Sequence, residues 1–431
     1  MSIGFVLERL FVVLALFFFS GAVLPLLQNP GGEGVVIIQD DPISRYALVV
    51  IYSIVLAFLA FRWKETLETM QRAPLFWALT LLAVTSSLWS TDPQVTLRAG
   101  VWLIASGLFA IYFVSRFPVR EQLRLLGTVL ALVLLLSLWF ALFVPSLGVD
   151  PGLHGGAWRG AFIHKNSLGR AMSIAVVVFI LVGVRNPLIA PLAWVAAAAA
   201  GVLVVLSKSG TAIAVTASLA LLVPLQLLLR TRRVPLFVVV AAFGIVLMSI
   251  GVFLASNWAA SLALIGRDPS LSGRTLLWAA VARMIMEKPW LGYGTQAFWH
   301  GGHADYAAVW KVVGWAPPHA HNGFLDVMLD LGVIGTGLFL IGFGFAVWRA
   351  LGVARYKKPA AEALWPLAYL AFFILSNLSE STILRQNSLF WILYGGTVSL
   401  LVGSTQTLRE TEQSHDYVDA GPRELQPTRG D

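Results

Sequence analysis

The sequence predicts an all-α, polytopic membrane protein, and three observations carry that prediction. Apolar runs of about 20 residues, the length that crosses a bilayer as a helix, recur from one end of the chain to the other. Of the 431 residues, 58% are hydrophobic and only 12% are charged, whereas soluble proteins carry roughly twice that charge fraction. The runs are solidly apolar and do not alternate, which excludes a transmembrane barrel.

Twelve spans are predicted, and together residues 1–403 form one transmembrane domain. The first apolar run has a weak n-region and is followed by many others, so we interpret it as a retained anchor rather than a signal peptide. The polar tail, 404–431, is expected to be disordered. The spans cover residues 8–27, 43–61, 74–90, 97–115, 123–144, 168–184, 188–206, 210–229, 234–255, 323–348, 364–378 and 387–403.

Basic residues set the orientation, because cytoplasmic loops are enriched in Lys and Arg. With both termini in the cytoplasm, the loops richest in these residues all face inward. Four stretches then face the periplasm, where basic residues break the pattern and become candidates for function. The longest is a loop, 256–322, between two spans. The others cover 145–167, 206–211 and 377–387.

Several functional classes are excluded at this point. The chain has no cysteine, which removes disulfides, thiolate nucleophiles and cysteine-bound metals. Its net charge of +8 comes from loops between spans, so it does not indicate a nucleic-acid partner.

The first candidate motif, 158–169, combines Arg159, His164, Lys165 and Asn166 just before a predicted span. Basic side chains at a helix end commonly anchor the helix at the membrane interface. The compact mixture of Arg, His, Lys and Asn beside two glycines favours an anion clamp instead, because ionisable groups at the membrane boundary are site candidates.

The second motif, 207–211, places Lys208 among small residues that permit close helix approach. Two interpretations stay open for Lys208: it ends a span at the interface, or it joins the anion site.

The third motif lies in the long loop and begins an amphipathic helix. From Thr275 to Met286 apolar residues recur at helical spacing, and Lys288 and Pro289 end the helix. Such a helix can lie on the membrane with Arg274 as an ordinary exposed charge. Alternatively, Arg274 adds a planar, permanently charged fork to a helix N-terminus, an arrangement suited to phosphate.

The fourth motif places His319 and His321, followed by Asn322, at the start of a span. Histidine exchanges protons near neutral pH. Two histidines without clustered acidic or cysteine ligands are a weak metal signal, so no metal is predicted. Asp326 follows within the head of the span and is placed to orient a histidine.

Taken together and in order, these motifs resemble the O-antigen ligase and polysaccharide polymerase (Wzy-C) superfamily. The His-Lys-Asn form, with Trp158 before Arg-Gly, is most similar to ExoQ-like exopolysaccharide polymerases. The motifs are Arg-Gly-x-Phe-x-His-Lys-Asn-x-Leu-Gly at 159–169, Ser-Lys-Ser-Gly-Thr at 207–211, Gly-Arg-x-x-x-Trp at 273–278, Pro-Trp-Leu-Gly-Tyr-Gly at 289–294 and His-Ala-His-Asn-Gly-Phe-Leu-Asp at 319–326, with Leu-Gly-x-x-Gly at 331–335.

The resemblance implies a GT-C-like fold and a metal-independent, cofactor-free, inverting glycosyltransferase on the periplasmic face of the bacterial inner membrane. Its donor would be an oligosaccharide on a polyprenyl (undecaprenyl) diphosphate, its acceptor a glycan, and its partners membrane lipids and a chain-length regulator. Arg274 would stabilise the diphosphate and His321 would act as base. The second basic residue would be either Arg159 or Lys165, with Lys208 beside it and His319, His164, Asn166, Asn322 and Asp326 in support.

Two other functions are compared with polymerisation in exopolysaccharide biosynthesis. One is transfer of the glycan to lipid A core, as an O-antigen ligase does, since ligases share the motifs. The other is a polysaccharide transporter or flippase. Transporters usually place ionisable residues near the bilayer midplane, whereas these crowd one face. The loop tryptophans, Trp290, Trp299, Trp310 and Trp315, either stack on sugars or anchor the loop at the interface.

Overall fold

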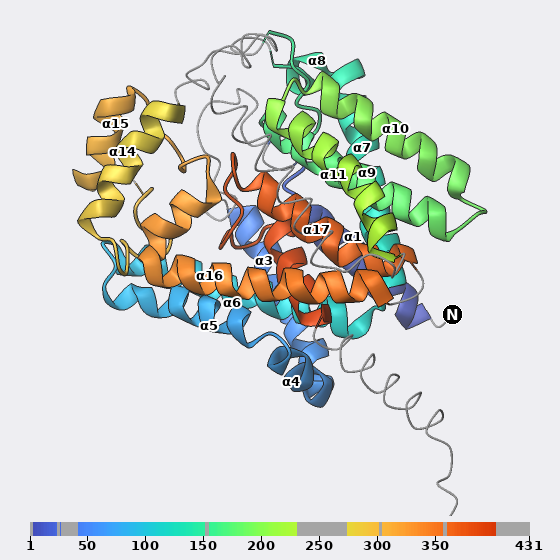
Figure 1. Cartoon of the computed structure of the whole chain (residues 1–431), viewed down its shortest axis with the longest axis horizontal. Helices are drawn as coiled ribbons and strands as arrows, with labels where there is room; N and C mark the ends of the chain where they lie inside the picture. The colour runs from blue at the N-terminus through green and yellow to red at the C-terminus, as the bar shows by residue number, and fades with distance from the viewer. Residues whose placement is uncertain are drawn as a thin grey trace, which may run out of the picture.

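Helices alone build the described part of the chain, as the composition predicts. The computed structural model describes residues 3–23, 26, 42–150, 155–230, 274–300, 304–356 and 360–401. Within them the strand-like pairing is confined to one isolated bridge, between Val149 and Trp158. The helices (Figure 1) are α1 (Ile3–Phe19), α3 (Pro42–Phe61), α4 (Trp63–Gln71), α5 (Pro74–Thr85), the 3-10 turn η1 (Ser86–Leu88), α6 (Pro93–Arg116), α7 (Val119–Phe143), α8 (Pro145–Gly148), α9 (Lys165–Arg185), α10 (Ala190–Leu206), α11 (Gly210–Arg230), α14 (Arg274–Glu287), α15 (Ala304–Val313), α16 (Gly323–Tyr356), α17 (Ala360–Ser376) and a last helix, Leu389–Leu401.

Predicted spans correspond to helices wherever the structure describes them. Within the described residues, five helices are long and apolar enough to cross a membrane, namely α3, α6, α7, α9 and the Gly323–Arg355 part of α16. Others, such as α10 and α17, are apolar but shorter. The chain is therefore a membrane protein, while the number of twelve spans stays a prediction. The predicted span 234–255, the loop residues 256–273 and the tail 404–431 lie outside the described residues.

One stretch that was expected to be a loop is helical. Residues 63–71 form α4, with Glu65 in its first turn and without Gly or Pro before Pro74. Acidic residues near a helix N-terminus and the absence of breakers both favour a helix. The orientation expected for its basic residues does not depend on this difference.

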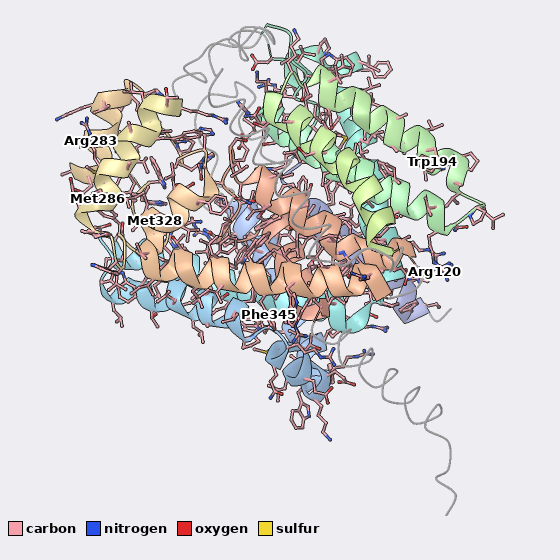
Figure 2. The ribbon with its side chains drawn as sticks, viewed as in Figure 1. Arg120, Trp194, Arg283, Met286, Met328 and Phe345 are labelled. Carbon is pink, nitrogen blue, oxygen red and sulfur yellow. The ribbon has the colours of Figure 1, made fainter. Side chains whose placement is uncertain are left out.

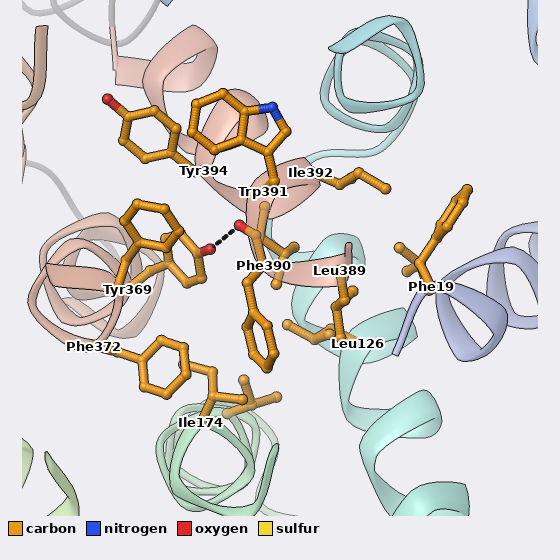
Figure 3. Close-up of a cluster of buried hydrophobic side chains, with 14 of the residues drawn as sticks. Phe19, Leu126, Ile174, Tyr369, Phe372, Leu389, Phe390, Trp391, Ile392 and Tyr394 are labelled. Atoms are coloured by element: carbon orange, nitrogen blue, oxygen red, sulfur yellow. Dashed lines mark hydrogen bonds between the residues drawn. The ribbon is translucent and has the colours of Figure 1, made fainter. Parts of the chain in front are cut away.

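Apolar side chains cover the outside of the helices, as they do in a protein that faces lipid. Trp194 on α10 and Phe345 on α16 point outward (Figure 2), with 49% and 40% of their surface exposed. Inside, aromatic rings from α17 and the last helix stack closely; the rings of Phe373 and Tyr394 lie 4.9 Å apart. Figure 3 shows this core, where the Tyr369 hydroxyl donates to the Phe390 carbonyl.

Ion pairs join the helix ends on the side that the basic loops predict to be cytoplasmic. The carboxylate of Glu8 on α1 accepts two hydrogen bonds of 2.7 Å from Arg116 at the end of α6. Arg185 at the end of α9 donates to Glu362 in the first turn of α17 over 3.1 Å. Both pairs tie helices that are distant in sequence.

Helix α16 is broken near its start, and the break positions the candidate site. Gly332 has φ 62° and ψ −160°, a conformation outside the helical region. A Cβ atom at Gly332 would lie 2.3 Å from the carbonyl oxygen of Trp290, so only glycine fits there. The amides of Val333 and Ile334 donate to the carbonyls of Pro289 and Trp290. The Leu-Gly and Pro-Trp-Leu-Gly motifs therefore interlock.

Helix α14 has the amphipathic stripe that its sequence predicts. Leu277 and Val281 are fully buried, and Met284 packs partly buried against the same cluster. Helix α14 contacts α15 and α16. The helices α14 and α15 form a small group beside the start of α16, at one end of the molecule (Figure 1). This face of α14 is thus covered by protein.

Candidate active site

The histidine motif is tied to the segment that follows α17. The side-chain oxygen of Asn322 caps α16 by accepting from the amides of Phe324 and Leu325, while its Nδ2 donates to the carbonyl of Leu378 over 3.3 Å. Gly323 donates its amide to the Asn377 carbonyl over 2.8 Å. These bonds hold the histidines against residues 377–388, and they explain the Asn-Gly pair in the motif.

Close packing at Gly323 fixes the approach of these two segments. A Cβ atom there would lie 2.2 Å from the side-chain oxygen of Asn377. That oxygen is already used, because it accepts from the amides of Thr382 and Ile383. The turn after α17 is therefore rigid at the point where it meets the histidine motif.

Glu380, on this turn, is the acidic centre of the site. It is buried, with 9% of its surface exposed. Its Oε1 accepts from Nδ2 of Asn166 over 2.8 Å and from Nη2 of Arg274 over 3.4 Å. Its Oε2 lies 3.8 Å from Nη1 of Arg170. Arg274 also donates to the carbonyl of Ser379 over 2.9 Å. Three distant parts of the sequence, 166–170, 274 and 379–380, thus meet at one carboxylate.

The two histidines lie beside this carboxylate. The ring centroids of His319 and His321 are 4.2 Å apart, and the side chains of both, with Glu380, offer polar atoms within 4.8 Å of one another. Among the described residues, Nδ1 of His321 is buried without a hydrogen-bond partner. An unpartnered buried ring nitrogen is costly unless something binds it, so His321 has a nitrogen available to a ligand.

Burial and nearby charges keep both histidines neutral. Burial lowers the pKa of His321 to about 4, an effect that Glu380 opposes and that Arg274 and His164 reinforce. Burial likewise lowers the pKa of His319 well below its usual value, with His321 adding to the effect. A neutral imidazole can accept a proton at physiological pH.

The carboxylate keeps its charge for a different reason. Burial raises the pKa of Glu380, but the positive charges of Arg170 and Arg274 outweigh it and bring the pKa below its usual value. The site therefore combines one ionised carboxylate, two guanidinium groups and two neutral imidazoles.

Tryptophan and aspartate side chains fix the backbone between the two histidines. Nε1 of Trp278 donates to the carbonyl of Ala320 over 2.9 Å. Oδ1 of Asp326 accepts from the amide of Ala320 and from Nε1 of Trp299, over 3.0 and 2.8 Å. The Asp326 side chain thus supports the histidine motif by binding the main chain of Ala320. The bond from Trp278 to the same residue explains why the Gly-Arg-x-x-x-Trp motif ends in tryptophan.

The first motif divides between the site and its scaffold. Asn166 reaches Glu380, and Nδ1 of His164 caps α9 by accepting from the Asn166 amide over 3.2 Å. Lys165 is buried at the first position of α9. Arg159 is also buried, and its guanidinium donates to the carbonyls of Leu147 and Ser146 over 2.7 and 3.2 Å. These bonds hold α8 against the segment that precedes α9.

The second motif contributes hydroxyl groups. Lys208 is exposed and donates to the carbonyl of Gly155 over 2.6 Å. By contrast, Ser209 and Thr211 line a small pocket together with Asn166 and Glu380, and the hydroxyl of Thr211 hydrogen-bonds that of Ser379 over 2.7 Å. The structure thus connects this motif to the site through Thr211.

Two site residues, Glu380 and Arg170, were not singled out from the sequence. Each nevertheless lies at a position that the sequence analysis could have recognised as a candidate. Arg170 lies inside the predicted span 168–184, and an ionisable residue within a span is a site candidate by default. Glu380 lies in the predicted periplasmic stretch 377–387, to which no role was assigned.

The cluster of His319, His321 and Glu380 has the composition of a metal site, which the sequence did not reveal because Glu380 lies far along the chain. Electrostatics argue against a cation at this place. Glu380 already pairs with Arg170 and Arg274, whose positive charges would repel a metal ion. Nδ1 of His319 is also occupied, since it accepts from the amide of His321 over 3.1 Å.

Comparisons with known proteins agree with the motifs. Residues 195–340 match the family model described as O-Antigen ligase. The chain is 26% identical over 348 residues to the exopolysaccharide production protein ExoQ of Rhizobium meliloti, covering 76% of this chain and 77% of that protein. It is also similar to two putative polysaccharide ligases, one from Rickettsia conorii (28% over 142 residues, 31% of this chain and 32% of that protein) and one from Rickettsia prowazekii (34% over 76 residues, 17% and 19%).

Proposed function

Because this chain belongs to the O-antigen ligase and polysaccharide polymerase superfamily and is similar over 76% of its length to an exopolysaccharide production protein ExoQ, we propose that it polymerises lipid-linked oligosaccharide repeat units. The donor is a polyprenyl-diphosphate-linked oligosaccharide, and the reaction takes place on the periplasmic face of the inner membrane during exopolysaccharide synthesis. The N- and C-termini are cytoplasmic, as the distribution of basic residues predicts.

One observation carries this proposal: Arg274 and His321, from two separate motifs, meet at Glu380. The guanidinium of Arg274 lies 3.4 Å from the carboxylate, and a ring nitrogen of His321 lies within 4.8 Å of it. A permanent cation suited to phosphate oxygens is thereby placed beside a neutral imidazole. In transfer of a glycan from a lipid diphosphate to a hydroxyl, the cation can stabilise the leaving diphosphate and the imidazole can take the proton of the hydroxyl.

The proposed reaction is a direct displacement at the anomeric carbon. His321 accepts the proton of the acceptor hydroxyl, whose oxygen forms the new glycosidic bond. The bond between the anomeric carbon and the diphosphate oxygen breaks, and its electron pair leaves with the lipid diphosphate. Arg274 stabilises the charge that develops there, which is usually the largest catalytic contribution, and Lys165 at the head of α9 adds a second cation. A displacement of this kind inverts the anomeric centre.

Arg159 and Lys208 have weaker support as diphosphate ligands than Arg274. Arg159 donates to the main-chain carbonyl of Leu147 in α8 and Lys208 to that of Gly155, so both hold the chain before α9 in place. We therefore assign Arg159 to the scaffold and leave Lys208, which is exposed, as an outer contact for the donor.

Two alternatives are separated by product analysis. The test uses membranes that contain the protein and lipid-linked repeat units extracted from the native host. Long ladders from the wild type that collapse to single repeats in Arg274→Ala and His321→Ala support the polymerase. Transfer of whole glycans to lipid A core, without lengthening, identifies a ligase that uses the same site. If both variants insert normally and keep full activity, the mechanism is wrong, and a transporter or flippase becomes the preferred alternative.

A further inference from the structure

Glu380 is a buried carboxylate at the centre of the site, and the reaction described above gives it no role. It is surrounded by side chains from three elements: Asn166 and Arg170 from α9, Arg274 from α14, and His321 from the loop before α16. The ion pairs of Glu8 with Arg116 and of Glu362 with Arg185 each join two helices. This one joins all the segments that carry the proposed chemistry.

The charges around Glu380 are arranged for an anionic substrate. Its single negative charge lies between two guanidinium groups, so the group of three keeps one net positive charge. The carboxylate also orients Arg274, because it fixes Nη2 while the carbonyl of Ser379 fixes Nη1. Without this support, a long arginine side chain would lose conformational entropy on binding the diphosphate.

The carboxylate also lies where it can respond to a change of charge on His321. During the proposed reaction the imidazole becomes an imidazolium, in a partly buried place where Arg274 opposes a positive charge. A carboxylate within 4.8 Å offsets that cost, because charges interact strongly where water is excluded. A histidine and a carboxylate commonly work as such a pair, one accepting the proton and the other stabilising the product.

We propose that Glu380 is a positioning residue for glycosyl transfer, which orients Arg274 and Asn166 toward the diphosphate and stabilises the imidazolium form of His321. This inference rests on the proposed function. The proton moves from the acceptor hydroxyl to His321 and remains there; Glu380 stays ionised throughout, and its charge compensates that of the imidazolium until the proton is returned to water or to the released diphosphate.

The charged and titratable groups that face His321 are Glu380, Arg274, His164 and His319. Of these, only Glu380 favours the protonated form of His321. Removing its charge therefore lowers the pKa of His321 further. Because the reaction needs a neutral His321, a variant without the Glu380 charge should lose activity only at a lower pH than the wild type. Its maximal rate should also be lower, because the imidazolium is no longer stabilised.

The test compares Glu380→Gln with the wild type. Glutamine keeps an oxygen that can accept from Asn166 and Arg274 but removes the charge. We expect kcat to fall about 10–100-fold, as for the loss of hydrogen bonds to charged groups, with little change in KM. The wild type is expected to lose about half of its rate near pH 4, whereas Glu380→Gln keeps its lower rate down to that pH. If Glu380 had a purely structural role, its replacement would not shift the pH at which activity is lost on the acid side of the profile (the acid limb).

Glu362→Gln provides a matched control, since Glu362 also joins α17 to an arginine of α9 but at the opposite end of both helices. It is expected to behave as the wild type. Glu380→Asp keeps the negative charge but moves it back by the length of one methylene group. The variant should lose activity at the same acidic pH as the wild type, and its rate should be about tenfold lower. Should Glu380→Gln not insert, this variant decides the question.

The outcomes separate the inference from the proposed function. If Glu380→Gln has the rate and the pH profile of the wild type while His321→Ala is inactive, the inference about Glu380 is wrong but the proposed function stands. Failure of both Glu380 variants to insert also contradicts it, because Glu380 would then be required for folding. Wild-type activity in His321→Ala contradicts the proposed function itself.

Discussion

Arg274 and Glu380 form an ion pair of 3.4 Å between residues 106 positions apart in the chain. The pair connects the start of α14, which belongs to the long periplasmic loop predicted from the sequence, to the turn after α17. Arg274 was expected as a cation on its own loop. The structure instead places it inside a network whose other members come from α9 and from the histidine motif, so the loop and the membrane helices share one site.

Replacement of Arg274 should reduce activity far more than replacement of another arginine on the same helix. We expect Arg274→Ala to lose about 10²–10³-fold in kcat, since preorganised donors at a developing anion contribute that much. Arg274→Lys keeps the charge but loses the fork, so it should recover only part of the rate. Arg283 is exposed and lies on the outer side of α14 (Figure 2). If Arg283→Ala proves as damaging as Arg274→Ala in the ladder assay, the assignment of Arg274 is wrong.

Gly332→Ala should destabilise the protein through the break in α16. The added Cβ would approach the Trp290 carbonyl to 2.3 Å at a positive φ, so the Pro-Trp-Leu-Gly turn has to move. Overpacking of this kind costs about 1–3 kcal/mol. The melting temperature in detergent measures the effect. Gly337 lies on the same helix with nothing within 4 Å of its added Cβ, and Gly337→Ala is the control; equal melting temperatures for the two variants would contradict the packing argument.

Among the loop tryptophans, Trp315 is best placed to contact a sugar. Its ring centroid lies 6.1 Å from that of His321, and 37% of its surface is exposed. Trp299 is instead engaged with Asp326. We expect Trp315→Ala to raise KM about 3–10-fold, as for the loss of one aromatic contact, and to leave kcat nearly unchanged. Trp290, which is 68% exposed, serves as the comparison in steady-state assays, and an equal rise in KM for Trp290→Ala would refute a specific role of Trp315.

The sequence was sufficient for the elements and for part of the site, because these depend on local patterns. Apolar runs identified the helices, and the stripe of Leu277, Val281 and Met284 identified α14. Arg274, His321 and Asn166 were predicted as candidates because each lies in a short motif with its own chemistry, and the structure brings all three to Glu380. Such features need no knowledge of which segments pack together.

The rest depends on tertiary packing. Glu380 contacts Asn166 across 214 positions, and no periodicity or motif encodes that approach. The same limit explains Arg159: its residue type suited an anion clamp, but in the structure its guanidinium donates to main-chain carbonyls of α8. Sequence patterns identify candidate side chains, whereas packing decides whether they face a ligand or a carbonyl.

Chelators should leave the activity unchanged, although His319, His321 and Glu380 have the composition of a metal site. Both guanidinium groups that pair with Glu380 disfavour a cation there. The measurement compares ladder formation in membranes before and after treatment with EDTA and with 1,10-phenanthroline. Loss of activity that returns only when a divalent metal is added would show that the three side chains bind a metal, and would change the proposed mechanism.

Stability should fall as the pH is lowered from 7 to 5, because His321 is held neutral in the folded protein. Its pKa of about 4 lies below the ordinary value of 6.5. Between these values the unfolded chain binds the proton more readily than the folded one, so acid favours unfolding. Glu380 does not contribute in this range, since its lowered pKa makes its stabilisation disappear only at a pH below its ordinary value of 4.5. His321→Gln removes one of the two half-buried histidines and should have a melting temperature that depends less on pH. If the variant and the wild type lose equal stability between pH 7 and 5, His321 is not neutralised by its surroundings, and its assignment as a proton acceptor with a lowered pKa is wrong.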